Sequence, residues 1–160
     1  MDLPKGKPIL CVDFDGVIHS YSSGWKGARC IPDPPVQGAF DFLVEAVEHF
    51  QVCIYSSRSR YLFGRWAMKK WLKKWFFELA MAVPEFDHKY ALHTWVSHFA
   101  FADPWEDEVR WGAYRLVDLI SFPTQKPPAF LQIDDRAITF TGKFPNIDEI
   151  KQFKPWNKRK

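Results

Sequence analysis

Residues 9–18 read ILCVDFDGVI, and this stretch predicts how the rest of the chain is arranged. Apolar residues lead directly into Asp13 and Asp15, and Gly16 follows. A short apolar run is typical of a buried strand, here residues 9–13, and the glycine marks a turn. Ligands of open α/β sheets bind beyond the carboxyl ends of the strands, so we expect both aspartates to face a site. Such close carboxylates repel each other unless a cation lies between them, and the simplest oxygen-preferring cation is Mg²⁺.

The composition is that of a globular protein. The 160 residues predict a single domain over residues 1–160 that needs no disulfide or metal to fold. The net charge of +3 permits an anionic substrate without demonstrating one. Cys11, Cys30 and Cys53 form no CxxC pair, which indicates free thiols in a reducing compartment. With no signal peptide and no apolar run of membrane-spanning length, we expect a cytoplasmic protein without membrane contacts.

Two further apolar runs repeat the design of the first. Residues 51–55 lead into Ser56, Ser57 and Arg58, and residues 129–133 lead into Asp134 and Asp135. Between the runs, apolar residues at helical spacing predict one helix from about residue 36 and a second over residues 62–81. We expect a third helix over residues 108–117. We expect two more short strands, over residues 119–122 and 137–140. The alternation of strands and helices predicts an α/β fold.

The connecting segments are less regular. We expect residues 19–35 to form a short flap beside the carboxylates, with residues 17–20 paired to 28–31 as a hairpin. In this flap, Trp25 either stacks on a base or packs within the flap. Residues 83–108 form a small insertion that shapes or covers the site. Its histidines are spaced five apart, which favours structural roles over a zinc site.

Two basic segments stand out. The lysines of residues 62–81 favour a solvated helix face over a surface for a partner or a membrane. The tail, residues 154–160, is basic, and we expect it to be frayed.

The order of these motifs resembles the haloacid dehalogenase (HAD) superfamily of phosphatases and phosphotransferases. Its first motif, DxDx(T/V), matches residues 13–17, and its strand-ending Ser or Thr matches Ser56. Its lysine matches Lys126, ahead of the last strand, and its acidic pair matches Asp134 and Asp135. The resemblance covers residues 9–140 apart from 83–108. Further short segments, such as GWKG at residues 24–27 and IDDRAI at residues 133–138, are similar to segments of small HAD-type proteins of bacteria and phages.

The resemblance implies a three-layer α/β/α Rossmann-like fold with a central, mostly parallel sheet. It implies that Asp13 is a nucleophile that forms an aspartyl-phosphate, and that Asp15 is a general acid and then a base. Mg²⁺ would be bound by Asp13, the backbone carbonyl of Asp15 and Asp134, with Asp135 supporting the metal waters or Lys126. The residues implied to bind the phosphoryl group are Ser56, Ser57 and Lys126. We expect Arg58 to contact the substrate from the rim of the site, which Arg136 could also line.

The expected function is Mg²⁺-dependent hydrolysis of a phosphate monoester. The insertion is too small for a large cap unless it pairs with a neighbouring chain, so the site is expected to be open to a large substrate such as a nucleic-acid end or a phosphoprotein. The terminal phosphate of a nucleotide or nucleic acid is the substrate we expect. The alternative is a nucleotide or nucleic-acid binding module on a HAD scaffold with little or no turnover. The sequence leaves the physiological substrate and the oligomeric state open.

Overall fold

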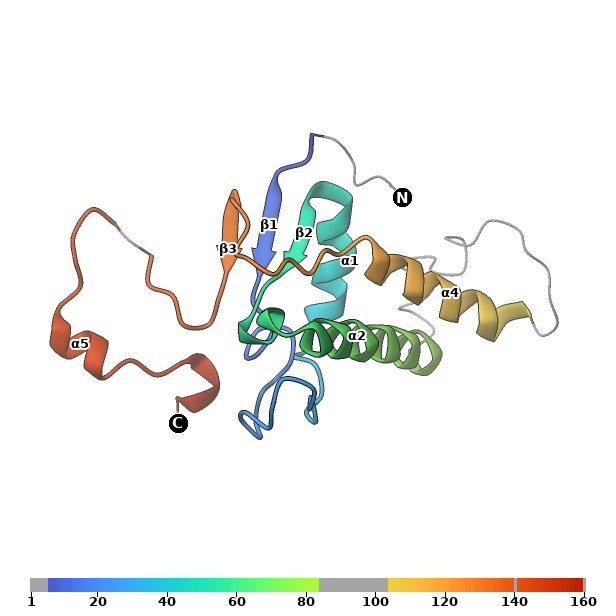
Figure 1. Ribbon diagram of the computed structural model, residues 1–160, viewed down its shortest axis with the longest axis horizontal. Helices are drawn as coiled ribbons and strands as arrows, with labels where there is room; N and C mark the ends of the chain where they lie inside the picture. The colour runs from blue at the N-terminus through green and yellow to red at the C-terminus, as the bar shows by residue number, and fades with distance from the viewer. Residues whose placement is uncertain (1–5, 84–103, 140, 160) are drawn as a thin grey trace.

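The computed structural model describes residues 6–83, 104–139 and 141–159, and Figure 1 shows their arrangement. The insertion expected over residues 83–108 falls largely outside these ranges, together with its three histidines. Those expectations therefore stay predictions.

A parallel sheet places the ends of its strands at one edge. The strands β1 (Ile9–Val12), β2 (Gln51–Ile54) and β3 (Leu131–Ile133) lie in the order β2-β1-β3. Both pairings are parallel, and Cys11 lies opposite Cys53 on one side and Gln132 on the other. The sequence-based prediction of an α/β fold with a parallel sheet is confirmed. All residues that follow these strands leave the sheet at the same edge.

Three longer helices accompany the sheet. They are α1 (Ala39–His49), α2 (Leu62–Ala82) and α4 (Pro104–Asp118), and in Figure 1 they lie on the side of β2. The helix expected from residue 36 begins later, at Ala39, and the amide of Val36 donates to the carbonyl of Ile18 at 2.8 Å. Gly38 then takes a left-handed conformation, φ 79°, at the start of α1. Among the described helices, none is both long and apolar enough to span a membrane.

The smaller elements differ in part from the expectation. Ser121 forms a single parallel bridge to Cys53 in place of a strand over residues 119–122. Residues 137–139 form no strand and are exposed, so the strand expected over 137–140 was wrong for its described part. Asn146 caps a short helix, α5 (Ile147–Lys151), by accepting a hydrogen bond from the amide of Asp148 at 2.9 Å. Two 3₁₀ turns, η1 (Ser57–Arg60) and η3 (Trp156–Lys158), also occur in the described part of the chain.

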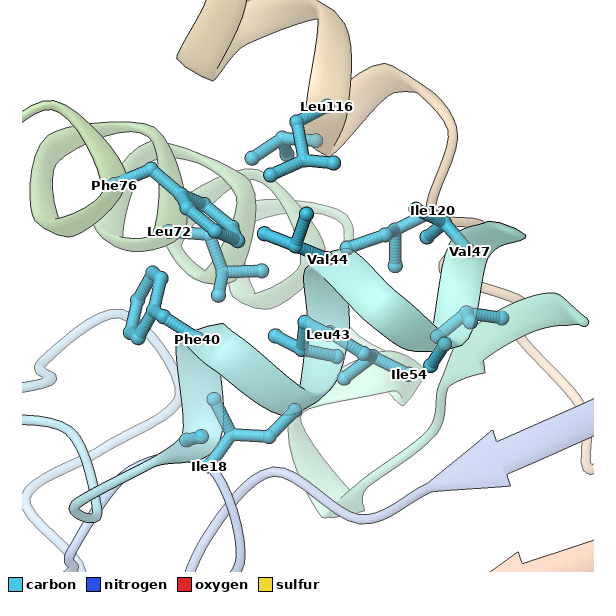
Figure 2. Close-up of a cluster of buried hydrophobic side chains, with 14 of the residues drawn as sticks. Ile18, Phe40, Leu43, Val44, Val47, Ile54, Leu72, Phe76, Leu116 and Ile120 are labelled. Carbon is cyan, nitrogen blue, oxygen red and sulfur yellow. The ribbon is translucent and has the colours of Figure 1, made fainter. Parts of the chain in front are cut away.

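The core lies between the helices and the sheet. Figure 2 shows its centre, where buried side chains of α1, α2, α4 and β2 meet: Leu43, Leu72, Leu116 and Ile54. Each fully buried side chain of this kind contributes roughly 1.5–3 kcal/mol relative to exposure. Cys11 and Cys53 are buried free thiols, as expected. This packing holds β1 and β2 in place and so fixes the position of the loops at their carboxyl ends.

Gly64, in the first turn of α2, offers a test of the packing at this edge. An added Cβ at this position would overlap the backbone carbonyl oxygen of Arg58. Gly to Ala usually stabilises an exposed helix interior by about 1 kcal/mol. Here we expect Gly64→Ala to lower the free energy of unfolding by about 1–3 kcal/mol, measured by urea denaturation. The exposed Lys70→Ala in the same helix should stay within about 0.5 kcal/mol of wild type. A Gly64→Ala protein as stable as wild type would contradict this packing.

Candidate functional site

The first and third strands deliver aspartates to the same place. The amide of Asp13 donates to the carbonyl of Ile133 at 2.9 Å, which continues the pairing of β1 with β3 by one hydrogen bond. Asp134 follows Ile133 directly. The two aspartates are therefore held next to each other by the backbone of the sheet.

Three carboxylates gather at this position. Asp13, Asp134 and Asp135 each offer an oxygen, and these oxygens all lie within 4.8 Å of one another. The structure thus brings together three of the four residues expected to bind metal. The side chain of Asp15 lies outside this group, and a contribution from its backbone carbonyl stays a prediction.

The hydrogen bonds of this cluster are unevenly distributed. Asp13 accepts from the amide of Phe14 at 2.7 Å, and Asp134 accepts from the Gln132 side chain at 3.0 Å and the Arg136 amide at 2.8 Å. The side chain of Asp135 is only 1% exposed. Neither of its oxygens has a hydrogen-bond partner among the described residues, and the guanidinium Nε of Arg136 is 3.8 Å away. A buried carboxylate without hydrogen bonds is costly, and a bound cation would remove that cost.

The electrostatics of Asp13 also fit a cation. Burial is the main reason that the pKa of Asp13 rises to about 7. The hydrogen bond from Phe14 opposes this rise, whereas the nearby carboxylates of Asp134, Asp15 and Asp135 add to it. Burial likewise raises the pKa of Asp135. A hard divalent cation among these oxygens would compensate for the like charges, so the donor set fits such an ion.

A cavity of about 360 Å³ opens beside the cluster. Its walls include six of the residues expected to form the site: Asp13, Asp15, Ser56, Ser57, Lys126 and Asp134. It is also lined by residues that sequence reasoning did not assign to the site: Tyr21, Tyr55 and Gln132. Arg136, expected at the rim, lines it too. The sequence contained a signal for two of them. Tyr55 ends the second apolar run, and Gln132 is a polar residue within the third.

Ser56 is fixed at the start of η1. Its hydroxyl oxygen accepts from the amide of Arg58 at 3.1 Å, and its own amide donates to the hydroxyl of Ser59 at 3.1 Å. This reciprocal capping sets the position of the Ser56 side chain. A hydroxyl that accepts one hydrogen bond still has its own hydrogen to donate, for example to an anionic ligand in the cavity.

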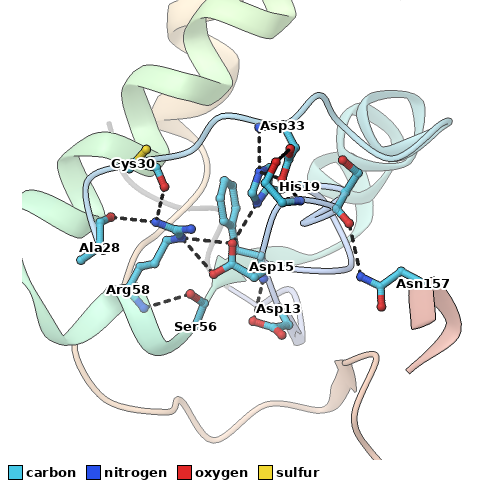
Figure 3. A network of polar contacts seen from close by, with 12 residues as sticks. Asp13, Asp15, His19, Ala28, Cys30, Asp33, Ser56, Arg58 and Asn157 are labelled. Atoms are coloured by element: carbon cyan, nitrogen blue, oxygen red, sulfur yellow. Dashed lines mark hydrogen bonds and ion pairs between the residues drawn. The ribbon is translucent and has the colours of Figure 1, made fainter. Parts of the chain in front are cut away.

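Arg58 lies beneath the site and not at its rim, where we expected it. It is 0% exposed and does not line the cavity. Its Nε donates to both oxygens of Asp15, at 3.1 and 2.9 Å (Figure 3). The physical reason is charge pairing, since a buried carboxylate such as Asp15 needs a cationic partner that is also desolvated.

His19 is a second partner of Asp15 that sequence reasoning missed. Its Nδ1 lies 2.9 Å from Oδ1 of Asp15, and its Nε2 accepts from the amide of Asp33 at 3.2 Å (Figure 3). Because Nε2 is the acceptor, the ring hydrogen lies on Nδ1 and is donated to Asp15. The available signal was a histidine four residues after Asp15, within a loop already assigned to the site.

The flap is paired differently from the expected hairpin. Ser20 donates to the carbonyl of Pro34 at 3.0 Å, so residues 17–20 do not pair with 28–31. The carbonyls of residues 27, 28 and 30 instead accept from Nη1 of Arg58, at 2.8, 3.0 and 3.0 Å. The Trp25 ring lies over the same guanidinium, 4.8 Å from its carbon. This contact agrees with packing within the flap, one of the two roles considered for Trp25.

The C-terminal tail contacts the loop that follows β1. The indole of Trp156 donates to the carbonyl of Gly16 at 2.7 Å, and the side chain of Asn157 donates to the carbonyl of Ser20 at 3.3 Å. The expectation of a frayed tail was therefore wrong for residues 154–159. The tail was judged by its lysines, whereas an aromatic side chain and an amide make its contacts.

Comparison with protein-family models, with curated proteins and with solved structures finds no match to this chain. The HAD resemblance stays a prediction from the motifs, and the interpretation of the site depends on its own geometry.

The raised pKa of Asp13 predicts how the metal-free protein responds to pH. The folded protein keeps this proton up to about pH 7, whereas the unfolded chain loses it near pH 4. The folded state therefore binds more protons between these values, and the free energy of unfolding falls as pH rises through this window. Asp13→Asn should make the fall shallower, measured by urea denaturation in EDTA from pH 4 to 8. An equally steep fall in the variant would show that Asp13 is not the group responsible.

Proposed function

We propose that the protein is a Mg²⁺-dependent phosphomonoesterase of the HAD type, with the three-layer α/β/α arrangement of that superfamily. One observation carries the proposal: the carboxylate of Asp13 lies with those of Asp134 and Asp135 and faces the same cavity as Ser56 and Lys126. A nucleophile, a cation site and phosphate-binding groups are what phosphoryl transfer requires.

The groups around the cavity have complementary tasks. Mg²⁺, held by Asp13 and Asp134 with Asp135 behind them, would neutralise the negative charge of the cluster and of the phosphoryl group. Lys126 supplies a second positive charge at the cavity wall, and Ser56 supplies a hydroxyl donor. Together they hold a phosphate ester with its phosphorus in front of Asp13.

The proposed reaction has two steps. An oxygen of Asp13 bonds to phosphorus while the bond to the leaving oxygen breaks, and Asp15 gives its proton to that oxygen. A water molecule then attacks the aspartyl-phosphate and gives its proton to Asp15. The bond between phosphorus and Asp13 breaks, which releases inorganic phosphate and restores both aspartates.

The cavity favours a substrate that extends beyond the phosphate. Tyr21 and Tyr55 line it together with Arg136, and the Arg136 guanidinium carbon lies 5.9 Å from the Tyr21 ring. Aromatic rings beside cationic side chains suit nucleobases and their phosphates. A nucleotide or a nucleic-acid end is therefore the substrate class we propose.

Removal of the nucleophile is the direct test of this function. Asp13→Asn should lower turnover of a chromogenic phosphate ester with Mg²⁺ by at least roughly a thousandfold. The fold should stay intact by circular dichroism. The control is Asp148→Asn, an exposed aspartate of α5 that should leave activity unchanged. Full activity in Asp13→Asn would eliminate the assignment. Nucleotide binding that is equal in EDTA, without product, would favour the alternative of a binding module.

The cation site has a test that does not need turnover. Mg²⁺ at a hundred times its dissociation constant should stabilise the wild-type protein by about 2.7 kcal/mol. Asp135→Asn removes one charge from the cluster and should reduce this gain, whereas Asp148→Asn should keep it. The measurement is thermal unfolding with increasing Mg²⁺. A gain of the same size in Asp135→Asn would contradict a cation site at this cluster.

A further inference from the structure

We propose that Arg58 is a positioning residue for Asp15, and that it couples the orientation of the Asp15 carboxylate to the flap. The inference deepens the proposed function, on which it rests, because it assigns the residue that prepares Asp15 for proton transfer. It is carried by the buried contacts of Arg58, which differ from those of a substrate-binding arginine.

The two oxygens of Asp15 have unequal surroundings. Oδ1 accepts from Nε of Arg58 and from Nδ1 of His19, at 3.1 and 2.9 Å. Oδ2 accepts only from Nε of Arg58, at 2.9 Å, among the described residues. The single hydrogen of Nε is shared between the two oxygens, whereas Oδ1 also accepts from His19, so Oδ2 has more capacity left for a further hydrogen. Oδ2 is therefore the oxygen left to carry and deliver a proton.

The guanidinium is committed to this role. Arg58 is fully buried, and Nη1 donates to the carbonyls of Gly27, Ala28 and Cys30 in the flap. A fully buried charge with this many partners is held in one geometry, since leaving it unpaired would be costly. The planar fork binds a carboxylate and a set of carbonyls at once, which a lysine ammonium on a flexible chain does not reproduce.

Arg58 and His19, the two partners of Asp15, are themselves held by further contacts. The amide of Arg58 donates to the hydroxyl of Ser56, so the residue that orients Asp15 also holds the phosphate-binding serine. The His19 ring stacks on Phe14 at 5.6 Å and lies edge-on to Trp71 at 5.6 Å. Figure 3 shows Arg58 between Asp15 and the flap carbonyls. A shift of the flap would therefore move Arg58 and, with it, Asp15.

The test uses the leaving group. An alkoxide needs a proton to leave, whereas a nitrophenolate does not, so misplacement of Asp15 should affect alkyl phosphates most. We expect Arg58→Lys to lower kcat/KM for an alkyl phosphate at least about tenfold more than for p-nitrophenyl phosphate. Loss of folding stability alone would lower both equally. An equal loss on the two substrates, or no loss, would overturn the proposal.

The matched control is Arg65→Lys. Arg65 lies in α2 and donates to the carbonyl of Ser59 at 2.7 Å, with no contact to Asp15, so its variant should show no leaving-group dependence. If Arg58→Lys does not fold, His19→Phe removes the other donor to Oδ1 and should show the same bias to a smaller degree.

A second measurement separates this proposal from the proposed function. If wild type hydrolyses neither ester, the phosphatase assignment fails, but the ¹³C NMR signal of the Asp15 carboxyl still reports its contacts. The signal is assigned with Asp15→Asn, and it should shift in Arg58→Lys and not in Arg65→Lys. An unchanged signal in Arg58→Lys would overturn the positioning role whatever the activity.

Discussion

Repulsion between carboxylates that cannot move apart is the constraint on which this site depends. The parallel pairing of β1 with β3 fixes Asp13 beside Asp134, and the turn after β3 adds Asp135, whose oxygens have no hydrogen-bond partner among the described residues. The core behind the sheet prevents these strand ends from separating. Such a concentration of negative charge favours a bound cation, and through it a phosphoryl group, as the ligand of this site.

Asp13 and Asp15 are separated by one residue, but their carboxylates have different surroundings. Asp13 belongs to the carboxylate cluster, which could hold a cation, whereas the carboxylate of Asp15 is paired with Arg58 and hydrogen-bonded by His19. In the proposed reaction, this difference would separate the nucleophile from the proton carrier. It also links the site to the flap through Arg58, and the tail adds a further hold on the loop through Trp156. Side chains of Arg58 and Trp156 thus donate hydrogen bonds to backbone carbonyls of the flap and of the loop after β1, and these bonds connect the segments around the cavity.

The strands and their polar ends could be predicted because an apolar run followed by acids or serines is a local pattern, and parallel pairing then brings those ends together. Asp13, Ser56 and Asp134 were expected at one site for this reason, whereas Lys126 was expected there only because of the HAD resemblance. The partners of buried charges could not be predicted in the same way. Arg58 follows Ser57 and was expected to contact the substrate, because the sequence does not show that Asp15 is buried and pairs with a desolvated cation. Trp156 was missed because its contact with the carbonyl of Gly16 crosses 140 positions of sequence. His19 lies only four residues after Asp15 and was missed because the pattern of strand ends assigns no partner to a carboxylate.

The central claim, a divalent cation held jointly by the ends of β1 and β3, can be observed directly. Crystals of the wild-type protein grown with Mn²⁺ in place of Mg²⁺ would reveal the ion by its anomalous scattering. The account predicts an anomalous peak about 2.0–2.2 Å from carboxylate oxygens of both Asp13 and Asp134. A Mn²⁺-saturated crystal without a peak between these two residues would contradict it.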